Sequence, residues 1–226
     1  MKIDRLILGA YQTNCYILRA SAAAKACPER TCPERSRRSR RDCLVIDTGL
    51  EAGELVDFLQ RHKLNPVAVV LTHGHADHTT GVAVLRENHP DIKVYIHKLD
   101  AEMLTERGSN MLAFAKLPFS TEPADFSLEE GDVIEQAGIK LKVLHTPGHT
   151  PGGISLYSKD EGIVFVGDTL FAESVGRTDM PGGSAAQLLK SIKEKLCILP
   201  DETIVYPGHG PQTTITQEKA NNPFLK

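Results

Sequence analysis

A dense run of potential metal ligands follows the apolar segment 67–71 (VAVVL). Imidazole and carboxylate groups are the ligands that zinc and similar divalent ions prefer. Alternate residues of an extended segment point the same way, so the two histidines at alternate positions can bind one ion. The carboxylate and the histidine after them enter a predicted helix and can bind a second. The four residues of this run are His73, His75, Asp77 and His78.

Further candidates follow three later predicted strands, where loops on a rigid scaffold commonly carry functional groups. His145 comes directly after LKVL, Asp168 after IVFVG, and His209 after TIVYPG. We interpret His149, which lies four residues beyond His145, as a residue that orients a ligand rather than as a ligand. Three other histidines are interpreted as surface residues near helix ends or in polar turns: His62, His89 and His97.

Strand and helix patterns interleave along the chain, with hairpins in each half. Short apolar runs rich in strand formers indicate strands at 13–19, 43–47, 66–71, 93–96, 133–134, 139–144, 153–157, 163–166 and 203–205. Helical spacing of apolar residues predicts helices at 51–62, 77–88, 100–107 and 184–196, the last with Ser184 as its N-cap. This order predicts an α/β (α+β) fold in which two mixed sheets pack face to face with helices outside. We expect one domain over 1–226.

Residues 20–42 differ from the rest of the chain. The segment repeats Cys-Pro-Glu-Arg and Ser-Arg-Arg and lacks apolar periodicity. It carries a local charge of +4, so the rest of the chain carries −7 when the total charge is −3. Two interpretations stay open, namely a basic arm that binds nucleic acid or a partner, and an enlarged hairpin loop without function. We favour the loop, because insertions in surface loops cost little free energy.

The bulk composition narrows the setting. With 26 basic and 29 acidic residues, the chain has no general preference for nucleic acid or anionic membranes. It contains no apolar run of the ~18 residues that read as a spanning helix and no signal-peptide h-region at its beginning, so we expect a cytoplasmic protein without a membrane partner. Five cysteines are an odd number and argue against a disulfide framework. The sequence favours no particular oligomeric state.

Four motifs together resemble the metallo-β-lactamase superfamily, in content and in order: THGHADH, HTPGHTPG, VGDTLF and YPGHG. The resemblance covers the chain except for residues 20–42 and implies a four-layer αββα sandwich with two metal ions at one edge of the sheets. It implies that the first metal is bound by His73, His75 and His145, the second by Asp77, His78 and His209, and that Asp168 bridges both.

The stretch GRTDMPGG at 176–183 and the residues after His209 are similar to the short bacterial glyoxalase II group, which lacks the helical C-terminal domain of other hydroxyacylglutathione hydrolases. The resemblance implies a small-molecule thioester substrate such as S-D-lactoylglutathione. We interpret Arg177 and Asp179 as an ion pair that orders a loop near the substrate.

Two divalent ions about 3.5–4 Å apart can share a hydroxide that attacks the thioester carbonyl. Zinc is the expected metal, with iron or manganese as alternatives, and Asp77 and Asp168 are the candidate catalytic carboxylates. One rival is a persulfide dioxygenase with a single iron bound by His73, His145 and Asp168. A second is a nuclease of the same fold, for which the −7 remainder of the chain lacks the expected basic face. A non-enzymatic binding module would not need all seven ligands.

Overall fold

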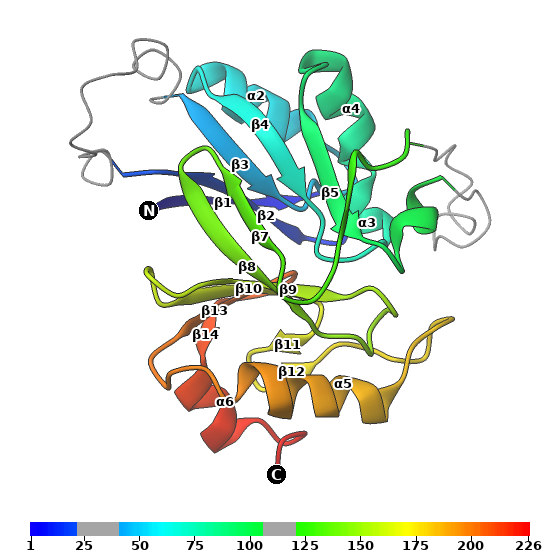
Figure 1. The fold of residues 1–226 in the computed structure, drawn as a ribbon, viewed down its shortest axis with the longest axis vertical. Coiled ribbons are helices and arrows are strands. Elements are labelled where there is room, and N and C mark those ends of the chain that lie inside the picture. The colour runs from blue at the N-terminus through cyan, green and yellow to red at the C-terminus, as the bar shows by residue number, and fades with distance from the viewer. Residues whose placement is uncertain (22–40, 106–120) are drawn as a thin grey trace.

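The structure is a computed structural model that describes residues 1–21, 41–105 and 121–226. Two sheets of six strands each pack against one another, and helices cover both outer faces, as Figure 1 shows. The predicted four-layer αββα sandwich is confirmed. The expected insertion at 20–42 falls largely on residues 22–40, which lie outside the described residues.

The first sheet has the order β1-β2-β3-β4-β5-β6. Its first three strands pair antiparallel, whereas β3, β4, β5 and β6 run parallel. Parallel strands end at the same edge, so the segments that follow them meet there. The strands are β1 (Lys2–Leu8), β2 (Thr13–Arg19), β3 (Asp42–Ile46), β4 (Asn65–Val70), β5 (Lys93–His97) and β6 (Phe126–Leu128).

The second sheet has the order β14-β13-β10-β9-β8-β7. It is antiparallel except for β10 and β13, which run parallel, so both sheets are mixed. Its strands are β7 (Val133–Gln136), β8 (Ile139–His145), β9 (Ile154–Ser158), β10 (Ile163–Gly167), β13 (Ile204–Pro207) and β14 (Thr213–Thr214), and a separate hairpin is formed by β11 (Leu170–Phe171) and β12 (Ser174–Val175).

Helices cover the outer face of each sheet. On the first sheet lie α2 (Gly53–Arg61) and α4 (Gly81–Asn88), which follows the short α3 (Ala76–Thr79); a 3-10 turn, η2 (Ala101–Leu104), follows β5. On the second lie α5 (Ala185–Ser191), its π-helical continuation η4 (Ile192–Leu196), and α6 (Ile215–Asn221). Ser184 caps α5 as predicted, because its side chain accepts a hydrogen bond from the backbone N–H of Gln187.

Three apolar clusters hold the layers together, and strand alternation decides which residue enters which. Along β2, Tyr16 and Leu18 face the second sheet, whereas Cys15 and Ile17 face the helices. Along β10, Phe165 enters the core between the sheets, and Val164 packs toward α5. None of the described helices is long and apolar enough to cross a membrane.

Candidate metal centre

The run of potential ligands lies at the carboxyl edge of the parallel strands. Residues 72–75 leave the end of β4, and His75 precedes α3, which carries Asp77 and His78 in its first turns. In the second sheet, Asp168 follows β10 and His209 follows β13, its parallel neighbour. Both sheets therefore deliver their ligands to the same edge of the sandwich.

The side chains at this edge form three overlapping triads that could hold metal ions. Within each triad, one ligand atom from each residue lies within 4.8 Å of the others. The triads are His73–His75–His149, His73–His78–Asp168 and Asp77–His78–His209.

Asp168 lies between the outer two triads. Its Oδ1 is 3.4 Å from Nε2 of His78, and its Oδ2 is 3.6 Å from Nε2 of His149 and 3.5 Å from Nε2 of His209. A carboxylate at that position can contact ions on both sides. The structure thus places Asp168 where the sequence resemblance implies a bridging ligand.

The structure corrects the predicted roles of His145 and His149. His149, which was interpreted as an orienting residue, is the histidine of this loop that joins His73 and His75, with its Nε2 2.8 Å from Nδ1 of His75. His145 belongs to none of the three triads. Its ring stacks on His97 with centroids 4.1 Å apart, and its Nε2 lies 2.9 Å from the carbonyl oxygen of Pro151.

Strand alternation explains the correction. His145 is the last residue of β8 and shares the side of Leu141 and Val143, which enter the core between the sheets. It therefore meets His97, at the end of β5 in the opposite sheet. His97, which we expected at the surface, is only 2% exposed. The chain has to turn through Pro147 and Gly148 before a histidine can face the triads.

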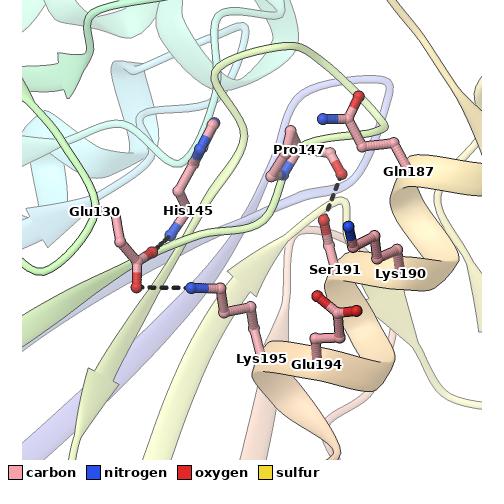
Figure 2. A pocket seen from close by; sticks show the side chains of 8 residues that line it. All are labelled: Glu130, His145, Pro147, Gln187, Lys190, Ser191, Glu194 and Lys195. Carbon is pink, nitrogen blue, oxygen red and sulfur yellow. Dashed lines mark hydrogen bonds and ion pairs between the residues drawn. The ribbon is translucent and has the colours of Figure 1, made fainter.

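Figure 2 shows the surroundings of His145 on the outer side of this loop. The backbone N–H of His145 donates to Oε2 of Glu130 at 2.6 Å, and Lys195 donates to Oε1 of the same carboxylate at 2.8 Å. Ser191 of α5 donates to the carbonyl oxygen of Pro147 at 2.7 Å. These residues line a surface pocket between this loop and α5, and no member of the triads lines it.

Hydrogen bonds to the outer ring nitrogens fix the orientation of three histidines. Nδ1 of His78 lies 2.8 Å from Oδ2 of Asp47, Nδ1 of His149 lies 2.7 Å from the carbonyl oxygen of Arg177, and Nδ1 of His209 lies 3.0 Å from the carbonyl oxygen of Tyr11. Each bond leaves Nε2 to face the triads. Partners of this kind select the tautomer that a metal ligand needs.

Asp47 was not singled out from the sequence. It is 1% exposed and also accepts hydrogen bonds from the backbone N–H and the hydroxyl of Thr72, each at 2.8 Å. It therefore holds the start of the ligand run and His78 together. Its position at the end of a strand that neighbours β4 was the available signal.

The carboxylates give this edge a strongly negative field. Burial acts against a charge on His78, yet Asp77, Asp168 and Asp47 together raise its pKa to about 10. In the triad His73–His75–His149 the pKa shift has the opposite direction. Burial and the neighbouring His149 and His78 lower the pKa of His75 to about 3. His75 is therefore neutral and offers a lone pair, and the carboxylates around His78 favour a cation.

The donor set fits divalent metal ions. Nε2 of His73 and Oδ1 of Asp168 are buried and have no hydrogen-bond partner among the described residues. Buried polar atoms without partners are rare in proteins, and these two belong to residues of one triad, so both fit the role of metal ligands. Nitrogen and oxygen donors without a thiolate are compatible with zinc, iron or manganese.

Two glycines allow the ligand loops to approach one another. A Cβ on Gly208 would overlap Oδ1 of Asp168 and lie 2.8 Å from Cε1 of His78, and a Cβ on Gly176 would overlap the carbonyl oxygen of Asp168. Only a residue without a side chain fits at either position.

Arg177 and Asp179 form the predicted ion pair in the loop after β12. Nε and Nη2 of Arg177 donate to the two carboxylate oxygens of Asp179 at 2.7 and 2.9 Å. Both side chains are more than half exposed. The loop reaches the site through its backbone, since the carbonyl oxygen of Arg177 is the partner of His149.

The family model described as "Metallo-beta-lactamase superfamily" matches residues 38–209, which contain every residue of the three triads. The chain belongs to this superfamily. The resemblance drawn from the four motifs is confirmed.

Curated relatives within the superfamily extend over most of the chain. "Probable metallo-hydrolase YqgX" of Bacillus subtilis is 36% identical over 228 residues, which cover 100% of this chain and 98% of the relative. "Hydroxyacylglutathione hydrolase GloC" of Haemophilus influenzae is 36% identical over 187 residues, which cover 82% of this chain and 88% of the relative. These relatives agree with a short glyoxalase II-like member.

Solved structures of the superfamily share the fold. The BLEG-1 B3 metallo-beta-lactamase is 36% identical with a TM-score of 0.87, and each chain is covered in full. TTHA1623, solved in a di-iron-bound form, is 37% identical with a TM-score of 0.80 over 98% of this chain and 100% of that one. ETHE1 from Myxococcus xanthus is 29% identical with a TM-score of 0.74 over 99% and 84% of the two chains.

Proposed function

We propose that this chain is a metal-dependent hydrolase that cleaves a thioester such as S-D-lactoylglutathione. The observation that carries the proposal is the pair of triads, His73–His75–His149 and Asp77–His78–His209, with Asp168 between them. The similarity to a relative named hydroxyacylglutathione hydrolase supports the choice of substrate. The partner is then a small molecule in the cytoplasm, not a nucleic acid or a membrane.

The residues divide the chemical work. Two divalent ions in the triads would supply an activated water and polarise the thioester carbonyl. Asp168 would hold both ions at a fixed separation. Asp77 lies 3.3 Å from Nε2 of His209 through its Oδ2 and acts as a ligand, so it is not a free general base.

Substrate would approach from the side of His209. Its side chain is 27% exposed and that of Asp168 is 13% exposed, whereas His73, His75 and His78 are nearly inaccessible. The ring of Phe171 lies 6.3 Å from that of His209 and offers an apolar contact at this opening.

None of the three cysteines in the described residues belongs to the metal-ligand triads, and Cys197 packs against the apolar cluster of α5 and η4. Cys15 and Cys43 are fully buried in β2 and β3 and face the helices, away from the site. Burial raises the pKa of the Cys43 thiol to about 12 and that of Cys15 well above its usual value, so neither forms the reactive thiolate.

Zinc is the metal we propose, with iron as the next choice because TTHA1623 was solved in a di-iron-bound form. A persulfide dioxygenase is the second candidate function, since ETHE1 shares the fold at 29% identity. Its single iron would be bound by His73, by Asp168 and by His149 in place of the predicted His145, since His73 shares a triad with each of the other two and Nε2 of His149 lies 3.6 Å from Oδ2 of Asp168. The complete second triad, Asp77–His78–His209, favours the hydrolase.

The decisive experiment combines metal analysis with a substrate panel. The purified chain is analysed for metal content and then assayed for thiol release from S-D-lactoylglutathione, for oxygen consumption with glutathione persulfide, and for hydrolysis of a cephalosporin. We expect two ions per chain and thiol release as the dominant activity. One iron per chain with oxygen consumption would establish the dioxygenase instead, and cephalosporin turnover alone would point to a lactamase.

A further inference from the structure

Asp100 is a buried carboxylate to which the proposed chemistry assigns no role. It lies three residues after the end of β5, directly before η2, and has no exposed surface. Burial of a carboxylate is costly unless hydrogen bonds satisfy it. The groups that satisfy Asp100 therefore indicate what it is for.

Three neutral donors from two different loops satisfy this carboxylate. Oδ2 accepts from the backbone N–H of Gly74 at 2.9 Å and from the hydroxyl of Thr150 at 2.7 Å, and Oδ1 accepts from the backbone N–H of Gly152 at 2.6 Å. No ion pair with Asp100 occurs in the described part of the chain. Its hydrogen bonds thus go to loop backbone and hydroxyl, in contrast to the surface carboxylates that pair with lysine or arginine.

The two loops that Asp100 joins carry the residues of the triad His73–His75–His149, called the first triad from here on. Gly74 lies between His73 and His75, and Thr150 directly follows His149. The loops come from different sheets, one after β4 and one between β8 and β9. The Asp100 carboxylate therefore connects the two loops whose imidazoles have to meet to form this triad.

The loop that carries Gly152 packs tightly against Asp100. A Cβ on Gly152 would lie 2.5 Å from Oδ1 and 2.7 Å from the backbone nitrogen of Asp100, so the loop is in direct contact with the carboxylate. Asp47, rather than Asp100, holds the residues around the second triad, Asp77–His78–His209. It contacts His78 of that triad and also Thr72.

We propose that Asp100 is a positioning residue for the first triad: it fixes the spacing of His73 and His75 relative to His149 and thereby sets the metal affinity of that triad. The proposal rests on the metal site of the proposed function. It predicts that a change at Asp100 acts on one of two metal sites and spares the other.

The test compares Asp100→Asn with Asp125→Asn in the full chain. Asn cannot accept all three hydrogen bonds, since its amide nitrogen has to face at least one N–H donor. Asp125 is a matched control, because it also accepts from a backbone N–H, that of Val94, and from a side chain, Arg86, but it lies away from the triads. Zn²⁺ affinity of the metal-stripped proteins is measured by competition with a chromophoric chelator, and folding by circular dichroism.

We expect Asp100→Asn to weaken one of the two zinc sites by about ten- to a hundredfold, the usual effect of losing an orienting partner, while Asp125→Asn retains both affinities. Single-site backgrounds assign the effect. In His209→Ala, Asp100→Asn should weaken the remaining zinc, and in His75→Ala it should not. If Asp100→Asn does not fold, Thr150→Val removes one of the three bonds and should weaken the same site about threefold, a small part of that loss.

Wild-type affinity at both sites in a folded Asp100→Asn protein would overturn the positioning role, as would an equal loss at both sites or a wild-type affinity in Thr150→Val. Failure of the unaltered chain to bind zinc would overturn the proposed metal function itself. The two failures are distinguished by the unaltered protein.

Discussion

Asp168 connects the two halves of the candidate site more directly than any other described side chain. Its two oxygens lie within 3.6 Å of imidazole nitrogens from His78, His149 and His209, which come from the helix α3 and from two different loops. Two divalent ions bound on either side of Asp168 would repel one another unless an anion lay between them, and the Asp168 carboxylate would supply that negative charge.

We therefore expect Asp168→Ala to lower kcat by at least about a hundredfold on S-D-lactoylglutathione and to release at least one metal ion. Arg177→Ala should mainly raise KM, because Arg177 is exposed, pairs with Asp179 and reaches the site only through its backbone. Steady-state kinetics with metal content measured alongside separates the two. Normal kcat in Asp168→Ala would contradict the bridging role, and a collapse of kcat in Arg177→Ala with both metals bound would make Arg177 catalytic.

His149 and His145 offer a matched pair for testing the first triad. We expect His149→Ala to lose high-affinity metal binding at one site, because it removes one of three imidazoles that meet there. His145→Phe should keep two metals, since a phenyl ring can still stack on His97 and only the contact to Pro151 is lost, at a cost of about 1 kcal/mol. Metal stoichiometry of the two variants decides between them. Metal loss in His145→Phe alone would restore the original prediction.

The residue types of the site could be predicted from the sequence, but not every assignment. Four ligand residues within six positions form a local signal that needs no tertiary information. The choice between His145 and His149 depends on which side of β8 faces the other sheet. In the sequence, the only sign of this is that Leu141 and Val143 occupy the same alternating positions of β8 as His145. Asp47 has only its position at a strand end as a local signal and Asp100 has none, because each acts on residues distant in sequence.

At the scale of elements, the site requires loop ends to approach more closely than side chains normally permit. β10 and β13 run parallel and end side by side, so Asp168 and Gly208 are neighbours across the strand pair. The backbone N–H of Gly208 donates to the carbonyl oxygen of Gly167 at 2.8 Å. His78 of α3 reaches across from the first sheet to the same point.

Gly208→Ala should therefore displace Asp168 or His78 and reduce metal affinity and kcat by at least about tenfold, while the fold persists. Gly53→Ala, at the start of α2, is the control, because a Cβ there meets nothing within 4 Å. Circular dichroism and zinc titration of both variants check the prediction. If Gly208→Ala bound two ions with unchanged affinity, the close approach would have no functional importance.

The strands that build the site were predictable because they are apolar on both faces or alternate regularly. The segments 13–19 and 163–166 were predicted within one residue of their bounds, and their interior burial explains why. β1, by contrast, is an edge strand with mostly half-exposed residues, and α6 has only two buried residues, so neither has a strong pattern. The predicted helix at 77–88 is divided at Thr80, which ends α3 and precedes α4. Gly81, the first residue of α4, packs closely against Thr48 and Ala52.

For the molecule as a whole, the sandwich brings ligands from both sheets to one edge. The connection between β2 and β3, from Arg19 to Asp42, carries none of these ligands. The two strands pair antiparallel, with Leu18 opposite Leu44. This register places residues 20 and 42 opposite one another, a separation that a two-residue turn can bridge.

We predict that replacing residues 21–41 by Asn-Gly leaves folding, metal content and thioester hydrolysis close to those of the full chain. β2 and β3 already make their hydrogen bonds without the segment, and a shorter loop lowers the entropy cost of closing the hairpin by about 2 kcal/mol at most. The replacement also removes all seven basic residues of the segment, so it tests the nucleic-acid arm at the same time. Thermal unfolding, zinc titration, kcat and binding to single- and double-stranded oligonucleotides are compared in the two proteins. A folded replacement protein without activity, or full-chain binding to oligonucleotides that the replacement abolishes, would show that the segment is functional.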